Sequence, residues 1–226
     1  AVIVHGIWQF HSVATYLACK KSTVPYFVFI HGALDPWFKQ NYKAKHLKKC
    51  LYWLLVEYHV LRRAKGLLFT SDDERLLARH SFWPYSFKEL VVGFGKEDSC
   101  ENLVLNDDLF IKKFPKLTDK KLILFVSRMH EKKGVDILVE GFLSIVSQFP
   151  DYHLVMMGPD PDGFQSKLQV KYPKSLAFHV TWTGWVDSEE KWSAYARAEV
   201  FALVSHSENW GAAVVEALLS GTPVLL

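Results

Sequence analysis

The chain has 226 residues, of which 50% are hydrophobic and 23% are charged, and its formal net charge is +3. This composition is typical of a globular protein and excludes the disordered and fibrous classes, while the charge is too small to indicate nucleic-acid binding. The three cysteines, Cys19, Cys50 and Cys100, are widely spaced and form no Cys-x-x-Cys pair. They indicate a reducing compartment rather than a disulfide framework or a zinc site.

No apolar run approaches the ~20 residues that span a bilayer, and no signal peptide opens the chain, so we expect a cytoplasmic protein. Both ends, residues 1–4 and 224–226, lie inside apolar runs. A natural domain rarely begins and ends within core strands, because the neighbouring strands would be left uncovered. We therefore expect a fragment of a longer protein that lacks segments at both ends.

The first half of the chain alternates predicted strands with predicted helices. The strands are expected at 1–4, 25–30, 66–71 and 89–92, and the helices at 12–21, 39–65 and 72–80. A His-Gly pair follows each of the first two strands, as His5-Gly6 and His31-Gly32. Ligands contact the carboxyl ends of strands in α/β sheets, and glycine lets a ligand approach the backbone. These four residues are candidate site residues, although a histidine at a strand end is more often structural.

The helical segment 39–65 carries two kinds of side chain. Apolar residues recur at helical spacing and are expected to face the core: Leu47, Leu51, Leu54, Leu55, Tyr58 and Leu61. Eight further residues are basic: Lys39, Lys43, Lys45, Lys48, Lys49, Arg62, Arg63 and Lys65. One interpretation is a surface that contacts an anionic membrane, which would place the protein at the inner membrane face. The other interpretation is an ordinary solvated helix face.

Residues 96–121 are polar and irregular, and they contain turn formers such as Asn106 and Pro115. We predict the domain boundary in this stretch, with residues 1–110 in an N-terminal domain and residues 111–226 in a C-terminal domain.

The second half alternates strictly between strands and helices. Strands are expected at 122–126, 152–157, 178–183 and 200–204, and helices at 134–149, 164–172 and 212–219. A further helix begins after Asp187, where Glu190 completes a capping box. Strict alternation predicts an α/β fold with a parallel, doubly wound sheet.

Two polar loops follow strands of this second sheet. The loop 127–134 contains Arg128 and Lys133, between the end of a strand and the start of a helix, where fixed cations can stabilise a phosphate leaving group. Asp160 and Asp162 follow the next strand. Because Asp, Pro and Gly are dense around them, they indicate a turn rather than a metal site.

The most specific pattern lies near the end of the chain. Glu208 precedes an apolar helix and Glu216 lies within it, with seven residues between the two carboxylates. An ionised carboxylate is costly to bury unless it is paired or hydrogen-bonded, and sugar or ribose hydroxyls are suitable partners. The helix N-terminus beside Gly211 adds backbone N–H groups that favour an anionic or hydroxyl-rich ligand.

The sequence from Glu208 to Ala217, followed by Gly221-Thr222-Pro223, resembles the E-x7-E signature of family 4 retaining glycosyltransferases of the GT-B fold. This resemblance implies two Rossmann-like domains, of which the N-terminal one faces the acceptor and the C-terminal one binds the donor. It also implies a nucleotide-diphosphate sugar as the donor substrate, without a metal or other cofactor.

The resemblance assigns roles on the donor side. Arg128 and Lys133 would bind the donor phosphates, and Glu216 would bind the ribose. The donor sugar would be held by Glu208, Asn209, Trp210 and Gly211.

On the acceptor side, His31 begins a His-Gly-x-Leu-Asp-Pro-Trp sequence that resembles an acceptor-side loop of the same family. The resemblance implies that His31 faces the donor sugar and, with Glu208, contributes to catalysis. His5, Gly6 and Gly32 complete the predicted acceptor-side loops.

These features predict a retaining glycosyltransferase that moves a sugar from a nucleotide sugar to a glycan or lipid-linked acceptor. As a fragment, the chain is expected to bind nucleotide weakly and to turn over poorly. A sugar-nucleotide epimerase of the same fold is an alternative, although no added acid–base set is evident. A hydrolase that uses Glu208 and Glu216 would need both carboxyls in an open cleft, whereas Glu216 is expected to be buried. A non-catalytic basic α/β module that binds through residues 39–65 is the remaining alternative.

Overall fold

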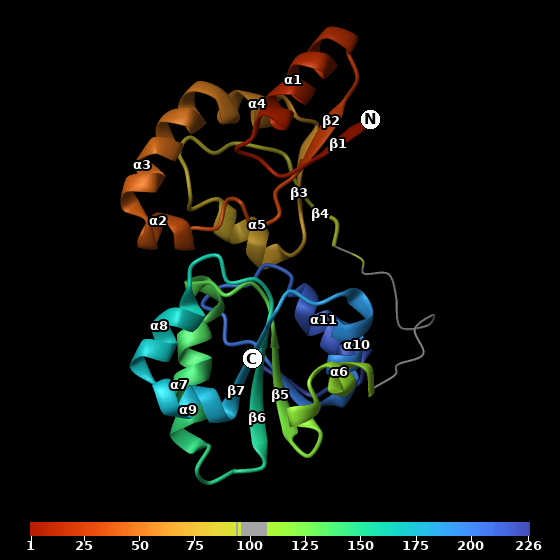
Figure 1. Ribbon diagram of the computed structural model, residues 1–226. Helices are drawn as coiled ribbons and strands as arrows, with labels where there is room; N and C mark the ends of the chain where they lie inside the picture. The colour runs from red at the N-terminus through yellow and green to blue at the C-terminus, as the bar shows by residue number, and fades with distance from the viewer. Residues whose placement is uncertain (94, 96–107) are drawn as a thin grey trace. The chain divides into compact units, whose positions relative to one another are not determined.

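The computed structural model describes residues 1–93, 95 and 108–226. The chain divides into two compact units, Ala1–Gly95 (unit 1) and Lys96–Leu226 (unit 2), as Figure 1 shows. The division falls before the predicted boundary at residue 110, because helix α6 (Asp108–Lys113) packs on helix α10 (Ser188–Arg197) of unit 2. The backbone N–H of Phe110 donates to Ser193 Oγ at 2.9 Å. Of the residues discussed above, Cys100 and Asn106 lie outside the described residues.

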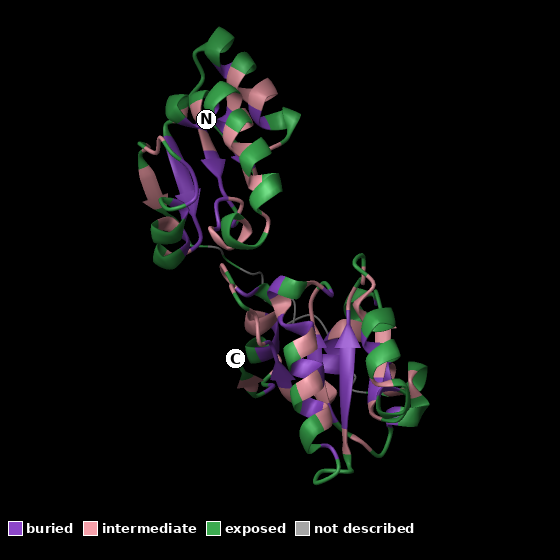
Figure 2. Ribbon diagram, turned by 90° about the vertical axis from the view of Figure 1, so that its left-hand side faces the viewer, coloured by how far each residue is buried: buried purple, intermediate pink, exposed green. Residues whose placement is uncertain are grey.

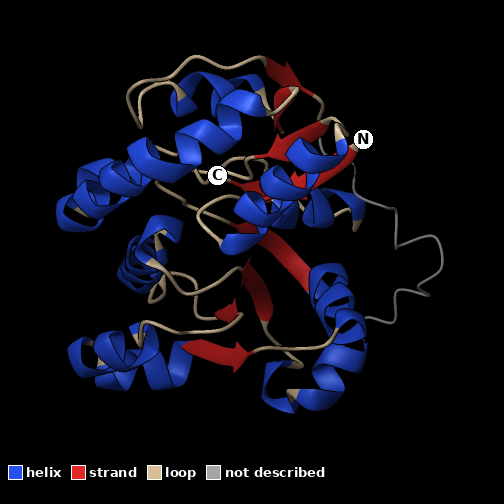
Figure 3. Ribbon diagram, turned by 90° about the horizontal axis from the view of Figure 1, so that it is seen from above, coloured by secondary structure: helices blue, strands red, loops and turns tan. Residues whose placement is uncertain are grey.

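Unit 1 contains a parallel sheet of four strands in the order β1-β2-β3-β4. The strands are β1 (Val2–His5), β2 (Tyr26–Phe29), β3 (Gly66–Phe69) and β4 (Glu89–Val91). Helices alternate with them along the chain: α1 (Phe10–Ser22) follows β1, and α5 (Asp72–Ala78) follows β3. Figure 3 distinguishes the helices from the strands by colour. The four predicted strands and the predicted helices 12–21 and 72–80 are therefore confirmed, with bounds that differ by a few residues.

The predicted helix 39–65 is divided in the structure. It consists of α2 (Trp37–Asn41), α3 (Lys43–Tyr52), the π-helix η1 (Trp53–Glu57) and α4 (Tyr58–Arg63), which follow one another along one side of the sheet (Figure 1).

Six residues of this segment were predicted to face the core, and the prediction is wrong for four of them. Leu61 is buried and Tyr58 is half-buried, but the four leucines that precede them along the chain are exposed: Leu47, Leu51, Leu54 and Leu55. A π-turn holds more residues per turn than an α-helix, so η1 shifts the helical register between the two groups. Trp53 and Glu57 occupy the inward face of η1 instead.

Unit 2 contains a parallel sheet of five strands in the order β7-β6-β5-β8-β9. The strands are β5 (Lys121–Val126), β6 (Tyr152–Met157), β7 (Val180–Gly184), β8 (Ala198–Ala202) and β9 (Val224–Leu225). In Figure 1, one side of the sheet is covered by α7 (Val135–Ile145), α8 (Phe164–Lys171) and α9 (Pro173–His179). The other side is covered by α6, α10 and α11 (Ala212–Leu219). The doubly wound parallel sheet predicted from the alternation is confirmed.

Two local predictions in unit 2 have different outcomes. The capping box is present, since Asp187 accepts the backbone N–H of Glu190 and the Glu190 carboxylate accepts the N–H of Asp187. The strand expected from residue 178 begins two residues later, because α9 extends through His179.

Each unit has its own hydrophobic core. The central strands of each sheet are largely buried, and buried strands are purple in Figure 2, where the outer turns of the helices are exposed. In unit 2, Leu124, Val155 and Phe201 on three neighbouring strands are 0–1% exposed. A parallel sheet covered on both faces by helices buries its strands in this way. Among the described residues, no helix is both long and apolar enough to cross a bilayer.

Candidate functional site

The loops after four strands of unit 2 are joined at the carboxyl edge of its sheet. The N–H of Ser127, after β5, donates to Met157 O at 3.1 Å, and the N–H of Gly158, after β6, donates to Gly184 O at 2.9 Å. The N–H of His206, after β8, donates to Lys132 O at 2.9 Å. Backbone bonds therefore bring the loop that contains Arg128 and the loop that contains Glu208 to the same edge.

Two glycines allow these loops to approach each other closely. A Cβ atom at Gly134 would lie 2.2 Å from Val204 O, and one at Gly158 would lie 2.1 Å from Ser127 O. Both glycines also have positive φ angles, of 64° and 133°, which other residues rarely adopt. The basic loop after β5 can therefore lie against the end of β8 only with glycine at position 134.

An ion pair joins the two loops. Lys133 Nζ contacts Glu208 Oε2, and both side chains are partly buried. These residues are 75 positions apart, and they were predicted separately to bind the phosphates and the sugar of one donor. Arg128 lies in the same loop as Lys133; its side chain is exposed and forms no ion pair with any residue that the structure describes.

Glu216 is buried in α11, as predicted, and is 5% exposed. Its carboxylate accepts hydrogen bonds from Lys191 Nζ at 2.8 Å and from Tyr195 Oη at 3.1 Å, both on α10. Burial and the charge of Glu216 raise the pKa of Tyr195 well above its usual range, so its hydroxyl stays protonated and donates. A carboxylate has about four acceptor positions, so it can accept several hydrogen bonds at once.

The residues between the two carboxylates form the turn that starts α11. Gly211 is the residue before the helix, with φ of 70°, and it is buried. The N–H of Asn209 donates to Glu208 Oε1 at 3.2 Å, which fixes the carboxylate against its own loop. Asn209 and Trp210 are half-buried beside it.

Asp160 has the structural role that was predicted for it. Its two carboxylate oxygens accept the backbone N–H groups of Phe164 and Gln165 at 2.8 and 2.9 Å, at the start of α8. Asp162 lies 3.8 Å from His130 Nε2. Among the described residues, no group of three or more His, Cys, Asp or Glu side chains could hold a metal ion.

In unit 1, the two predicted histidines are in direct contact. His5 Nδ1 and His31 Nε2 are 2.8 Å apart, at the carboxyl ends of β1 and β2. The ring of His31 also stacks on Phe29, with the ring centroids 4.2 Å apart. Desolvation lowers the pKa of His31, and the adjacent His5 lowers it further. The neutral form of His31 is therefore favoured, and its ring is hydrogen-bonded to the ring of His5.

Gly6 and Gly32 lie beside this histidine pair. The N–H of Gly6 donates to Phe29 O at 2.8 Å, and the N–H of Gly32 donates to Glu74 Oε1 at 2.5 Å. Glu74 also accepts the N–H and the hydroxyl of Thr70, each at 2.7 Å, so one buried carboxylate ties the loop after β2 to the end of β3. Glu74 was not among the residues predicted from the sequence. Its spacing from Ser71, which accepts the Glu74 N–H, is the capping pattern that could have indicated it.

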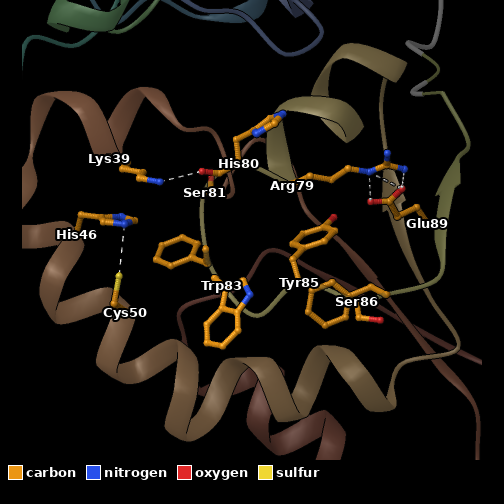
Figure 4. Close-up of a pocket in the computed structure, with 12 residues that line it drawn as sticks. Lys39, His46, Cys50, Arg79, His80, Ser81, Trp83, Tyr85, Ser86 and Glu89 are labelled. Carbon is orange, nitrogen blue, oxygen red and sulfur yellow. Dashed lines mark hydrogen bonds and ion pairs between the residues drawn. The ribbon is translucent and has the colours of Figure 1, made fainter.

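Unit 1 also contains a pocket of about 680 Å³ between α2, α3 and the segment after α5 (Figure 4). Lys39 and His46 lie on one side of it, Arg79 and Glu89 on the other, and Trp83 and Tyr85 lie between them. None of the predicted acceptor-side residues lines this pocket. Cations beside aromatic rings suit a ligand that has both an anionic and an apolar part.

Comparisons with known proteins relate the sequence of unit 2 to one family. The family model described as Glycosyl transferases group 1 matches residues 106–226. The chain is 32% identical over 113 residues to mannosylfructose-phosphate synthase of Agrobacterium fabrum, covering 47% of this chain and 25% of that protein. It is 34% identical over 107 residues to phosphatidyl-myo-inositol mannosyltransferase of Mycobacterium tuberculosis, covering 46% of this chain and 27% of that protein.

Solved structures show the same fold across both units. HepE of Anabaena, in complex with UDP and glucose, has a TM-score of 0.72 at 16% identity, covering 98% of this chain and 58% of that one. Sucrose-phosphate synthase from Thermosynechococcus elongatus has a TM-score of 0.72 at 20% identity, covering 98% and 55%. The two α/β units of the GT-B fold are thus confirmed. The chain spans a little over half of these structures, and its sequence matches cover about a quarter of the curated relatives.

The family model covers more than half of the chain, and the loops that carry the motif meet at one edge of the unit 2 sheet. The protein therefore belongs to the glycosyl transferases group 1 family.

Proposed function

We propose that the protein acts as a retaining glycosyltransferase, which moves a sugar from a nucleotide-diphosphate sugar to an acceptor. The observation that carries this proposal is the ion pair between Lys133 and Glu208, because it joins the predicted phosphate-binding loop to the predicted sugar-binding loop. HepE of Anabaena, which has the same fold, forms complexes with UDP and glucose and with UDP-glucose. A nucleoside diphosphate with an attached hexose is therefore the donor class that we assign to unit 2.

In this proposal, negative charge grows on the diphosphate as the bond to the sugar breaks. Lys133 and Arg128 would stabilise that charge at the carboxyl edge of β5, and loss of one such contact typically costs about 3–4 kcal/mol of transition-state stabilisation. Because two cations neutralise the leaving group, the proposal requires no metal.

The remaining donor contacts follow from α11 and the turn before it. Glu216 would accept the ribose hydroxyls while it keeps its bonds to α10. Glu208, with the backbone N–H groups of Trp210 and Gly211, would hold the hydroxyls of the sugar. The catalytic role of His31 is inferred from the resemblance, and the neutral form that its lowered pKa favours would suit a hydrogen bond to a sugar hydroxyl.

For the acceptor, we propose a glycan or lipid-linked molecule bound by unit 1. The pocket beside α3 supports this assignment, because its lining combines aromatic rings with a few charged groups. We also propose peripheral contact between residues 39–65 and an anionic membrane, which the eight basic residues of that segment support.

The donor assignment can be tested by thermal shift and calorimetry on the whole chain with nucleoside diphosphates and their sugars. At 100 times the dissociation constant, a bound nucleotide should stabilise the protein by about 2.7 kcal/mol. Lys133→Ala should remove most of this effect, whereas Lys174→Ala, an exposed lysine in α9, should not. If no nucleoside diphosphate stabilises the wild-type chain at millimolar concentration, the proposal is wrong.

A further inference from the structure

Helix α3 and the π-helix η1 expose a row of leucines. Leu47, Leu51, Leu54 and Leu55 are 73%, 62%, 47% and 67% exposed. Residues three and four positions apart lie next to each other on a helix, so these side chains form one continuous strip, the leucine strip. Single exposed leucines are common on protein surfaces, but a contiguous group of four indicates an interaction surface.

The opposite side of this helix is already used for folding. Trp53 and Glu57 in η1 are 0% exposed, and Trp53 Nε1 donates to Pro84 O at 3.1 Å. The segment is therefore held in unit 1 by its inner face, and the leucine strip makes no contribution to that core. The core of unit 1 therefore leaves this apolar strip uncovered.

The charges of segment 39–65 indicate the chemistry of a partner for the strip. Segment 39–65 contains eight basic residues, seven of them exposed and Lys49 half-buried. Its one acidic residue, Glu57, is buried. No ion pair joins any of the eight to a carboxylate within the described parts of the chain. A partner that fits must therefore offer apolar groups to the leucines and negatively charged groups to the basic side chains.

A second copy of the chain does not fit this description. Pairing two leucine strips face to face would bring two rims of basic side chains together, and like charges across an interface oppose association. A bilayer with anionic lipids supplies both features, since its acyl chains lie below a layer of negatively charged head groups.

We propose that α3 and η1 lie in the interface of an anionic membrane, with the four leucines inserted among the acyl chains. The inference rests on the peripheral contact proposed above and extends it, because basic residues alone would only hold the protein at the surface. Residues 43–57 span about 22 Å as a helix, and the strip from Leu47 to Leu55 occupies about 12 Å of that length. The helix therefore lies parallel to the membrane plane.

The test is co-sedimentation of the whole chain with vesicles. Phosphatidylcholine vesicles are compared with an equal mixture of phosphatidylcholine and phosphatidylglycerol, at low and at high salt. The insertion variant is Leu47→Gln/Leu51→Gln/Leu55→Gln, and Leu51→Gln alone serves as a milder form. The charge variant is Lys43→Gln/Lys45→Gln/Lys48→Gln. The matched control is Leu17→Gln/Val170→Gln, which replaces apolar residues exposed on α1 and α8.

The wild type and the control should bind the anionic vesicles and keep part of that binding at high salt, because salt screens charges but not apolar contacts. The insertion variant should bind about 100-fold more weakly and should lose its remaining binding at high salt, with the single variant in between. The charge variant should lose binding mainly at low salt.

Three results would overturn the inference. One is failure of the wild type to bind anionic vesicles. Another is an insertion variant that binds like the wild type while its circular dichroism is unchanged. The third is a lipid-free dimer that the insertion variant abolishes, which would assign the strip to a second copy. Stabilisation by UDP is measured in parallel, and its absence beside intact vesicle binding would refute only the donor assignment.

Discussion

At the scale of single residues, the donor site depends on two carboxylates in different surroundings. Glu208 lies in a loop and is paired with Lys133, whereas Glu216 is buried and paired with Lys191. A diphosphate carries more negative charge than one carboxylate, so we expect Lys133 to exchange Glu208 for the donor phosphates when nucleotide binds. Glu208 would then be released to contact the sugar.

This exchange can be measured with two substitutions. Lys133→Ala should weaken UDP binding by at least about tenfold, because it removes a cation from the phosphate site. Glu208→Gln should leave UDP affinity unchanged or tighter, since the competing carboxylate is lost. Isothermal titration calorimetry at low salt gives both values. A Glu208→Gln variant that loses as much affinity for UDP as Lys133→Ala would contradict the exchange.

We expect Glu216 to contribute both to the stability of the protein and to UDP binding, and two substitutions distinguish these contributions. Glu216→Gln should lower the free energy of unfolding by about 1–3 kcal/mol, because it weakens a buried, charge-assisted contact. It should also weaken UDP binding. Tyr195→Phe should cost about 1 kcal/mol of stability through the same network and leave UDP affinity unchanged. Urea denaturation and calorimetry distinguish these outcomes, and equal losses of UDP affinity in both variants would argue against the ribose contact.

At the scale of secondary structure elements, the start of α7 determines where the basic loop lies. Gly134 is the residue before this helix, and any side chain there would collide with the backbone at the end of β8. The helix start and the approach of the two loops thus depend on one residue.

Substitution of two glycines of this region should have opposite effects. Gly134→Ala should destabilise the protein by about 1–3 kcal/mol and weaken UDP binding, because the loop with Lys133 must move away from β8. Gly141→Ala lies in the middle of α7, where an added Cβ meets nothing within 4 Å. It should stabilise the protein by about 0.5–1 kcal/mol, as expected for alanine in a helix. Urea denaturation measures both, and a neutral Gly134→Ala would refute the close approach.

A buried histidine on β6, His153, reaches the neighbouring strand β7, where its Nε2 lies 2.9 Å from Thr181 Oγ1. Burial, and then the nearby His179 and Lys120, lower the pKa of His153 to about 4. Its neutral form therefore contributes stability that is fully present above the unfolded pKa of about 6.5 and is lost as the pH falls toward 4.

His153→Gln, which cannot be protonated in this range, should remove that pH dependence. As the pH falls from about 6.5 to about 4, the wild type should lose about 3 kcal/mol more of its free energy of unfolding than the variant. Urea denaturation at a series of pH values tests this, and parallel profiles for the two proteins would show that His153 is not responsible.

At the scale of the whole molecule, the chain has two cores that share no residue. We expect two unfolding transitions in calorimetry, one for each unit, and UDP should raise only that of unit 2. Hydrogen exchange identifies which transition belongs to which unit. A single unfolding transition, whose temperature rises with UDP, would show instead that the two units unfold together.

The sequence by itself determined the features that depend on local chemistry. The alternation of strands and helices, the capping box at Asp187 and the burial of Glu216 all follow from residue spacing within a few turns of chain. The E-x7-E pattern indicated the family for the same reason, since its two carboxylates lie on one loop and one helix.

Only the tertiary structure decided which distant residues meet and which helix face is buried. The contact of Lys133 with Glu208 depends on strand order, and the buried role of Glu74 depends on the loop after β2 folding against it. The leucine strip was assigned to the core because helical spacing shows that a helix has an apolar side, but it cannot show which side packs. Trp53 and Glu57, the first and last residues of η1, occupy the inward face instead, and this choice depended on packing against the rest of unit 1.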